Sequence, residues 1–177
     1  MTNQTALETS AEPLPTAPEA LLERLEALDI SYGLRRHKAV FTVAESTALL
    51  HGIPGTHCRN LFVRDKKETM FLVVAANETP VDLKRMQELL NCGRLSFGSP
   101  ERLWRHLGVR PGSVCPFAVI NDKDGAVQVV LDANMMKADR VVYHPLVNEM
   151  SISLTPTDLL RFLADTGHEP LMIDLKG

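Results

Sequence analysis

The chain has 177 residues, 45% of them hydrophobic, with a formal net charge of -3 and an isoelectric point near 6.1. This length suits one domain with a core of its own. The slightly acidic balance argues against a protein that coats nucleic acid without specificity, because such binding depends on neutralising many phosphates. Three cysteines at wide spacing, Cys58, Cys92 and Cys115, predict neither a disulfide framework nor a metal site.

The first residues have the composition of a leader. Residues 1–15 are rich in Thr, Glu, Pro and Ala and show no apolar period, so we expect them to be disordered and a single domain to occupy 16–177. The start of the chain lacks the basic and apolar segments of a signal peptide, and no apolar run reaches the roughly 20 residues that span a bilayer. We therefore expect a cytoplasmic protein without a membrane partner.

The first half of the chain mixes helix and strand signals. Thr16, followed by Pro18 and an acid, predicts a capped helix with a leucine stripe, and ISYGLRRH then predicts a strand. A second capping pattern at Thr42 predicts a helix that Gly52 can end. The runs CRNLFVRD and TMFLVVAA are rich in β-branched and aromatic residues and flank a charged stretch, which predicts an antiparallel hairpin.

The second half adds helices and further extended runs. Thr79 and Ser99 each precede a proline and predict helices that end near Asn91 and Gly108. FAVIND and AVQVVLD predict a second hairpin, RVVYHP and MSISLT two more strands, and Thr155 a final capped helix before PLMIDL. Helices and strands do not alternate strictly, so we predict an α+β (mixed α/β) fold, with a mixed, mostly antiparallel sheet and flanking helices.

Common catalytic motifs are absent from the sequence. There is no phosphate-binding GxxxxGK[ST] or GxGxxG, and no GxSxG or HExxH. His57 and Cys58 are neighbours on a predicted strand and should point to opposite faces, which argues against a thiol nucleophile. The loop 110–117 combines small residues with two prolines, so its N–H groups can approach a ligand, although an ordinary turn has the same composition. His144 fits a structural role or a functional one.

Five segments in order resemble one family: HKAVFTVAE, GTHCRNLFVRDKK, DLKRMQELLNCGRLSFGSPE, LGVRPGSVCPFAVINDKD and VVYHPLVNE. They are similar to the editing-domain superfamily that includes the YbaK proteins and the prolyl-tRNA synthetase insertion domain. The hairpin NLF-x-RDKK, the run RLSFG and the loop GSV-x-PF most resemble the free-standing alanyl-tRNA(Pro) deacylases of the ProXp-ala type, also described as prolyl-tRNA synthetase associated domain proteins. The likeness covers nearly all of residues 20–177.

The resemblance implies a trans-editing deacylase that hydrolyses mischarged Ala-tRNA(Pro) without a metal or dissociable cofactor. Arg59 and Asn60 occupy the place of a Lys-Asn pair associated with the scissile ester, so they are the candidate catalytic residues. By the same matching, the candidate substrate-binding residues are Phe41, Gly112, Ser113, Val114, Pro116, Phe117 and His144. The basic hairpin residues Arg64, Lys66 and Lys67 are candidate tRNA contacts, although short basic clusters are also ordinary surface charge.

The resemblance also implies partners and leaves alternatives open. The expected partner is the acceptor end of tRNA(Pro), with prolyl-tRNA synthetase or an elongation factor as further candidates and no DNA. One alternative is a deacylase of the same superfamily for cysteinyl-, seryl- or threonyl-tRNA. Another is a non-catalytic tRNA-binding module, because Arg59 replaces the family's lysine and a planar guanidinium is a poor substitute for a compact ammonium.

Overall fold

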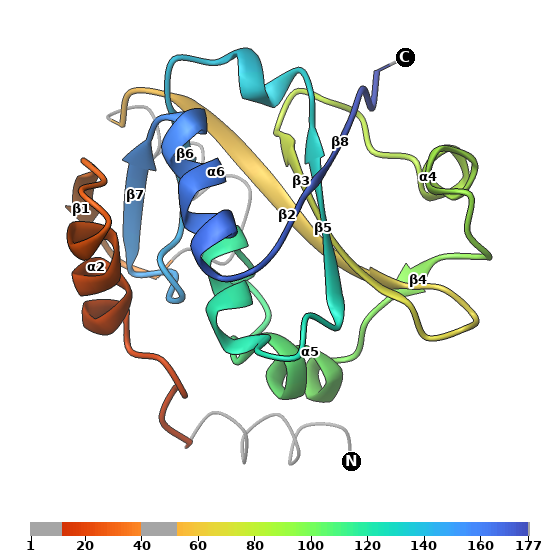
Figure 1. Ribbon diagram of the computed structural model, residues 1–177, viewed down its shortest axis with the longest axis horizontal. Coiled ribbons are helices and arrows are strands. Elements are labelled where there is room, and N and C mark those ends of the chain that lie inside the picture. Colours follow the sequence, from red (N-terminus) through yellow and green to blue (C-terminus); the bar gives the residue numbers. More distant parts are fainter. Residues whose placement is uncertain (1–11, 40–52, 177) are drawn as a thin grey trace.

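The computed structural model describes residues 12–39 and 53–176. Their strands form one sheet in the order β1-β7-β6-β2-β3-β5-β8, and β4 pairs with β2 beside this path (Figure 1). The bounds are β1 (Gly33–Arg36), β2 (Thr56–Arg64), β3 (Met70–Ala76), β4 (Ser96–Phe97), β5 (Val127–Asp132), β6 (Val141–Tyr143), β7 (Met150–Leu154) and β8 (Leu171–Ile173). Four pairings are antiparallel and three parallel, which confirms the predicted mixed, mostly antiparallel sheet.

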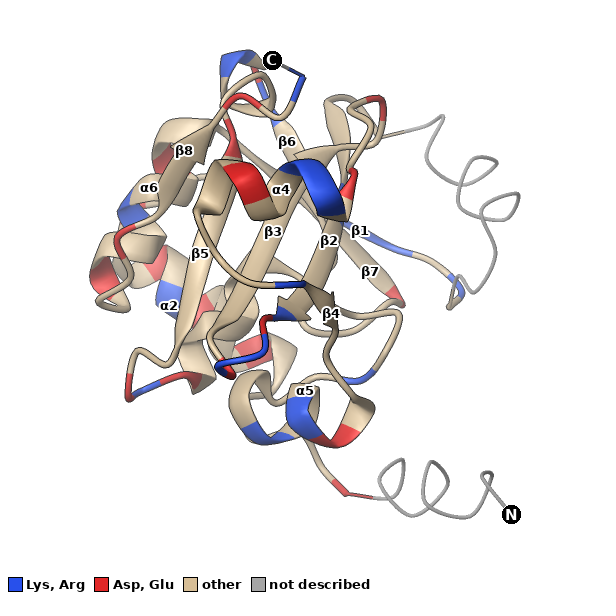
Figure 2. Ribbon diagram, turned by 90° about the vertical axis from the view of Figure 1, so that its right-hand side faces the viewer, with Lys and Arg blue, Asp and Glu red and all other residues tan. Residues whose placement is uncertain are grey.

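Helices cover both faces of this sheet. They are α2 (Pro18–Ala27), α4 (Leu83–Leu90), α5 (Pro100–Leu107), α6 (Pro156–Asp165) and the 3-10 helices η1 (Pro116–Asn121) and η2 (Met135–Lys137). The main core joins α2, α5, η1 and α6 to one face, and a smaller core joins α4 to the other (Figure 2). Within the described residues, no helix has the length and apolar character needed to cross a membrane.

Local capping signals account for two of the helices. The Ser99 hydroxyl accepts a hydrogen bond from the Arg102 N–H at 3.1 Å, and α5 ends at Gly108 with a φ of 62°. The Thr155 hydroxyl accepts from the Asp158 N–H at 3.2 Å at the start of α6. Both predicted caps are therefore confirmed, as expected for hydrogen bonds between residues three apart in sequence.

The other two predicted threonine caps are wrong. The Thr16 hydroxyl donates to Asn121 Oδ1 at 2.6 Å, and α2 begins without a side-chain cap. The Thr79 hydroxyl donates to Asp132 Oδ2 at 2.8 Å, while Asp82 caps α4 instead. In both cases a polar partner from a distant segment takes the hydroxyl that the local pattern assigned to the helix.

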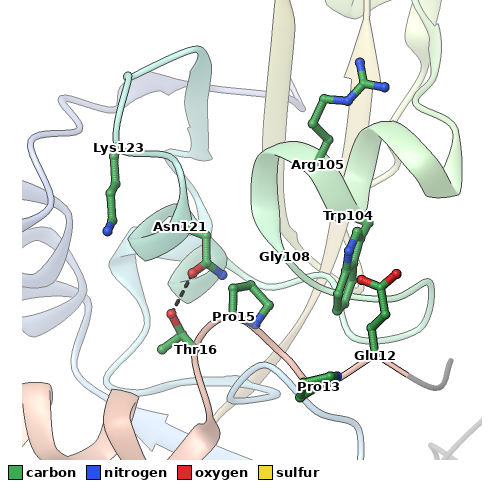
Figure 3. A pocket seen from close by; sticks show the side chains of 9 residues that line it. All are labelled: Glu12, Pro13, Pro15, Thr16, Trp104, Arg105, Gly108, Asn121 and Lys123. Atoms are coloured by element: carbon green, nitrogen blue, oxygen red, sulfur yellow. Dashed lines mark hydrogen bonds between the residues drawn. The ribbon is translucent and has the colours of Figure 1, made fainter. Parts of the chain in front are cut away.

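Residues 12–15, which the sequence assigns to the leader, contact the rest of the domain. Figure 3 shows Pro15 lying beside Gly108, where an added Cβ would come within 2.4 Å of the proline ring. The Arg110 guanidinium donates to the Glu12 carbonyl, and Leu14 packs against the main core. Residues 12–15 are thus held against α5 and η1 by contacts that the composition of this segment does not reveal.

The predicted hairpin of FAVIND with AVQVVLD is wrong. Residues 116–121 form η1, and β5 pairs in parallel with β3 rather than antiparallel with the FAVIND segment. Phe117, Ala118 and Val119 are buried around the whole turn of the helix, so the apolar run carries no alternation that distinguishes helix from strand. The predicted helix from Thr42 to Gly52 lies outside the described residues, as does Phe41.

Candidate active site

An interruption in strand pairing on one edge of β2 positions the site. On the β3 side, β2 is paired from Cys58 to Arg64. On the other side it pairs with β6 only at residues 56–57 and with β4 only at residues 63–64. Between these two pairings, no strand of the described part of the chain lies against this edge. The edge therefore offers main-chain groups to a ligand.

The main chain of Asn60 points to this unpaired edge. Thr56 N–H donates to the Arg140 carbonyl and Gly98 N–H donates to the Phe62 carbonyl, each at 2.9 Å and each on the side away from β3. In an antiparallel ladder successive residues direct their N–H and C=O to alternate sides. Asn60 lies two residues from Phe62 and four from Thr56, so its N–H and C=O also point to the side away from β3.

A small cavity of about 90 Å³ opens at this place. Its walls come from β2, from β6 and the turn after it, from β7, and from the residue that follows β3. The lining residues are His57, Cys58, Asn60, Asn77, Val142, Tyr143, His144 and Ser151. The structure thus brings Asn60 and His144 together across more than 80 residues of sequence, into a space that holds only a small group.

Asn60 has an unsatisfied polar atom in the cavity wall. Its Oδ1 is buried and has no hydrogen-bond partner among the described residues. Buried side-chain oxygens are paired in most native structures, because an unpaired one loses its hydration without compensation. A ligand with an N–H or O–H group would restore the missing bond, so Asn60 is a candidate binding residue.

One ring nitrogen of His144, a residue of the cavity wall, has no hydrogen-bond partner among the described residues. Its Nδ1 donates to the Met150 carbonyl at 2.9 Å, which leaves Nε2 for a ligand. Burial lowers the pKa of His144, and the nearby His37 and His57 oppose a positive charge on it further. The ring is therefore neutral at neutral pH, and Nε2 is a hydrogen-bond acceptor and a weak base.

A strained turn holds His144 in place. Leu146 adopts a left-handed φ of 71°, a conformation that residues other than glycine rarely adopt. Its N–H donates to the His144 carbonyl at 3.0 Å. The Leu146 side chain is buried in the main core. Packing of this side chain offsets the backbone strain, a combination that is common near functional sites.

A histidine outside the cavity orients a serine in its wall. The His37 Nδ1 donates to the Lys38 carbonyl at 2.7 Å, so in the neutral ring Nε2 accepts from the Ser151 hydroxyl at 2.8 Å. The His37 and His144 rings meet edge to face at 5.9 Å. Sequence reasoning missed His37 and Ser151, although the polar side chains that alternate with apolar ones in MSISLT are an available signal.

Cys58 and Tyr143 form an unreactive part of the wall. Burial raises the pKa of the Cys58 thiol to about 12, so the thiol stays protonated at neutral pH. Burial and the adjacent Cys58 raise the pKa of the Tyr143 hydroxyl well above its ordinary value. Neither group supplies a nucleophile under these conditions, because the thiolate rather than the thiol attacks.

Arg59 lies at the rim of the cavity. Neighbouring strand residues point to opposite faces, so Arg59 and Asn60 lie on different faces of the sheet. The Arg59 guanidinium is exposed and donates to the carbonyl of Asn77 at 2.9 Å, and Asn77 lines the cavity. A cation at this rim is placed to meet an anionic group of a ligand whose other end enters the cavity.

The small-residue loop supports the site from outside the cavity. Gly112 has a φ of 89° and lies beside Asn148, and the backbone of Leu146 lies close enough to the buried Cys115 thiol to lower its pKa against the larger effect of burial, which raises it. Residues 112–115, Ser113 and Val114 included, therefore pack against the strained turn that follows His144. Pro116 is buried with them at the start of η1.

Phe117 belongs to the core rather than to the cavity surface. Its side chain is fully buried and meets Tyr143 edge to face at 5.8 Å and Phe162 at 5.3 Å. The side chain thus supports Tyr143 from inside, which differs from the direct contact with substrate that the resemblance implied. The reason is that η1 turns this residue toward α6.

The basic hairpin residues are distant from the cavity. Lys66 and Lys67 are exposed in the turn between β2 and β3, and Arg64 ends β2. Asp65 orders the turn, because its Oδ1 accepts from the N–H groups of Lys67 and Thr69, both at 2.9 Å. Six residues separate Asn60 from Lys66, which corresponds to roughly 20 Å along an extended strand.

Comparison with known proteins identifies relatives. Residues 37–162 match the family described as aminoacyl-tRNA editing domain. The chain is 34% identical over 160 residues to the prolyl-tRNA editing protein ProX of Acetoanaerobium sticklandii, which covers 90% of this chain and 98% of that protein. It is 35% identical over 160 residues to prolyl-tRNA synthetase associated domain-containing protein 1 of Xenopus laevis, covering 88% and 95%. A solved candidate trans-editing enzyme for prolyl tRNA synthetase superposes with a TM-score of 0.69 at 20% identity, over 92% of this chain and 98% of that one.

Proposed function

The chain belongs to the aminoacyl-tRNA editing domain family, and on that premise we propose that it hydrolyses mischarged Ala-tRNA(Pro) to free alanine and tRNA(Pro). The observation that carries the proposal is the small cavity in which the unpartnered Oδ1 of Asn60 lies with the neutral ring of His144. The names of the relatives support prolyl-tRNA editing as the setting.

The size of the cavity supports alanine as the amino acid removed. A synthetase pocket for proline cannot fully reject a smaller apolar amino acid, so an editing site must apply the opposite test. A space of about 90 Å³ suits a methyl side chain. Forcing a pyrrolidine ring into a filled site costs about 1–3 kcal/mol or more, which protects the correctly charged tRNA.

The proposed chemistry needs no covalent intermediate. The Asn60 N–H, at the unpaired edge of β2, donates to the ester carbonyl oxygen as negative charge develops there. The Asn60 side-chain oxygen accepts from the substrate's ammonium, and Nε2 of His144 accepts a proton from the attacking water, directly or through the neighbouring ribose hydroxyl. As the water oxygen bonds to the carbonyl carbon, the bond from this carbon to the ribose oxygen breaks, and the ribose oxygen takes up that proton. Arg59 binds phosphate at the rim and holds the ester in the geometry for attack.

The decisive experiment compares deacylation of a panel of mischarged tRNAs by the purified protein. We expect Ala-tRNA(Pro) to be hydrolysed much faster than Pro-tRNA(Pro), because a small cavity favours the methyl side chain over the pyrrolidine ring. Cysteinyl- and seryl-tRNA test the alternative substrates within the superfamily. Equal rates on the alanyl and prolyl esters would show that size exclusion is not the basis of selection.

Arg59 separates an enzyme from a binding module. In an enzyme, Arg59→Ala should slow single-turnover hydrolysis of Ala-tRNA(Pro) and weaken binding, because the terminal nucleotide loses its anchor. Arg59→Lys should be neutral or slower in an enzyme adapted to a guanidinium. If wild type instead lengthens the lifetime of the ester, and Arg59→Lys creates hydrolysis, the protein is a binding module.

The proposal also specifies where the protein works and with what. The ligand is the acceptor end of tRNA(Pro), and the protein acts in the compartment where tRNA is charged, which we expect to be the cytoplasm. Association with prolyl-tRNA synthetase or an elongation factor would place the cavity near newly charged tRNA. Pull-down of either protein from a mixture with purified components tests this part.

A further inference from the structure

One aromatic side chain is far more exposed than its chemistry favours. Phe97 in β4 is 63% exposed, more than any other large hydrophobic residue among those described, with Met172 next at 52%. A single exposed apolar residue is ordinary on a protein surface. Phe97 differs from such a residue in two respects: its backbone is held in place on both sides, and basic residues lie nearby.

The backbone around Phe97 is anchored on both sides. The preceding Leu95 is buried, and its N–H donates to Gln87 Oε1 at 2.9 Å. The following Gly98 donates to the Phe62 carbonyl at 2.9 Å, and a Cβ added at Gly98 would lie 2.6 Å from the Phe62 ring. The chain is thus held close to β2 while Phe97 projects into solvent.

Basic residues lie on the segments next to β4. Arg64 pairs with Ser96 in the β2–β4 ladder, and Gly93 lies against Lys66, which places Arg94 beside the hairpin turn. Arg102 of α5 reaches the same turn and meets Glu68 at 3.2 Å. Figure 2 shows this face, with β4 between the hairpin and α5.

We define the β4 surface as Phe97 with the cations Lys66, Lys67, Arg94 and Arg102. The acids on it are Glu68, which is paired with Arg102, and Glu101 in the first turn of α5. Asp65 is buried, and its carboxylate accepts a hydrogen bond from the Lys67 N–H within the turn. In a chain with a net charge of -3, this surface has a local excess of positive charge.

We propose that the β4 surface binds the 3′ end of the tRNA, with Phe97 stacked on an unpaired base and the cations on its phosphates. The inference rests on the proposed function and adds a second contact site to it. Phe97 pairs with Val63, and directly opposed residues of an antiparallel pair share a face of the sheet. Arg59, four residues before Val63, points to that face as well.

The cavity and the β4 surface are close enough for one strand of RNA. Val63 lies three residues from Asn60 along β2, which corresponds to roughly 10 Å. An RNA strand whose terminal ester enters the cavity crosses the unpaired edge of β2 to Arg59 and continues to Phe97 along the face that these two residues share. An exposed aromatic ring among cations is the pattern by which proteins hold single-stranded nucleic acid without reading its sequence.

Binding of uncharged tRNA(Pro) tests the proposal without requiring catalysis. In fluorescence anisotropy, Phe97→Ala should weaken binding between about fivefold and about a hundredfold, the range for loss of one base–aromatic stack. Phe97→Tyr should keep the affinity. Met172→Ala removes the next most exposed large hydrophobic residue among those described, from the far edge strand β8, and serves as the matched control. Thermal unfolding of each variant verifies that it is folded.

Salt dependence separates the roles within the surface. Arg94→Ala should flatten the plot of log affinity against log salt by about one unit, because one phosphate contact is lost. Phe97→Ala should weaken binding without changing that slope, since stacking releases no counterion. A flattened slope for Phe97→Ala would mean that the ring only positions the cations, which contradicts stacking.

A minimal ester separates this proposal from the proposed function. Alanine esterified to adenosine reaches the cavity but not β4, so Phe97→Ala should hydrolyse it like wild type while its KM for Ala-tRNA(Pro) rises. If wild type binds tRNA but hydrolyses neither ester, the proposed function fails and the binding result still decides the role of Phe97. Unchanged tRNA affinity in Phe97→Ala, or a change in its oligomeric state in sedimentation, overturns the proposal and in the second case points to a contact between copies of the chain.

Discussion

Asn60 and Asn121 are both shielded asparagines, but their amide groups are in opposite situations. Asn121 accepts from the Thr16 hydroxyl and donates to the Leu107 carbonyl at 2.9 Å, whereas Asn60 Oδ1 is buried without a described partner. A satisfied amide contributes to stability, and an unsatisfied one costs stability. The retention of the unfavourable arrangement at Asn60 is expected where the group serves a ligand.

Alanine substitution of the two residues should therefore have opposite effects. Asn121→Ala should lower the free energy of unfolding by about 1–3 kcal/mol and leave deacylation intact. Asn60→Ala should abolish most deacylation while the free energy of unfolding stays the same or rises. Urea denaturation together with single-turnover hydrolysis of Ala-tRNA(Pro) measures both. A strong loss of stability in Asn60→Ala would assign Asn60 a structural role.

The lowered pKa of His144 predicts how the rate depends on pH. Hydrolysis should be independent of pH above about 6.5, the ordinary histidine value, and should fall at lower pH as Nε2 becomes protonated, with a midpoint below that value. His106→Ala in α5 is the control and should leave the profile unchanged. A rate that rises on acidification would contradict a neutral His144 in the reaction.

The lowered pKa of His144 also predicts how the free energy of unfolding depends on pH. Burial disfavours the charged ring in the folded state, so the unfolded chain binds more protons between the folded pKa and 6.5. The contribution of His144 is thus complete above the ordinary histidine pKa and is lost as the pH falls below it. Compared with wild type, His144→Asn should lose less stability between pH 7.5 and pH 5.5, as measured by urea denaturation.

At the scale of elements, β2 serves two purposes along its length. Its first half carries Asn60 at the unpaired edge, and its end leads into the basic turn. β3 pairs with β2 from Cys58 to Arg64. The strand therefore fixes the spacing between the cavity and the candidate phosphate contacts. A ligand that bridges the two must itself be extended and anionic, which tRNA satisfies.

The basic turn predicts a salt-dependent affinity for tRNA. Lys66→Ala and Lys67→Ala should each flatten the plot of log affinity against log salt by about one unit if each side chain meets a phosphate. Lys137→Ala, in η2, removes the same charge from another element and should leave the slope unchanged. Slopes equal to wild type in both hairpin variants would show that Lys66 and Lys67 contact no phosphate and are ordinary surface charges.

At the scale of the whole molecule, one buried pair ties the C-terminal segment to the centre of the chain. Asp122 accepts from the N–H groups of Ala126 and Val127, and its Oδ2 meets His168 Nε2 at 2.9 Å. The side chains of Asp122 and His168 are almost fully shielded. Through this pair the segment after α6, which leads to β8, is fixed against the start of β5.

Removing Asp122 should destabilise the fold without affecting the site. Asp122→Ala leaves the buried N–H of Val127, the N–H of Ala126 and the imidazole without their acceptor, so the free energy of unfolding should fall by roughly 3 kcal/mol. Asp124→Ala in the same turn is the control and should change stability little, because Asp124 is exposed. At a temperature where Asp122→Ala is still folded, it should deacylate at the wild-type rate; a large loss of rate would link this pair to the cavity.

The sequence by itself determined the family, the mixed sheet, the β2–β3 hairpin and the caps at Ser99 and Thr155. These features depend on residues within a few positions of one another, where periodicity and capping act. It also singled out Asn60 and His144, through resemblance to a family. Tertiary structure alone decided that Thr16 and Thr79 bond distant partners, that Phe117 turns into the core, and that β3 pairs with β5 in parallel. It likewise decided that Ser151, His37 and Asn77 join the site, because the cavity lies where β2, β6 and β7 meet, and contacts between segments so far apart leave no local pattern in the chain.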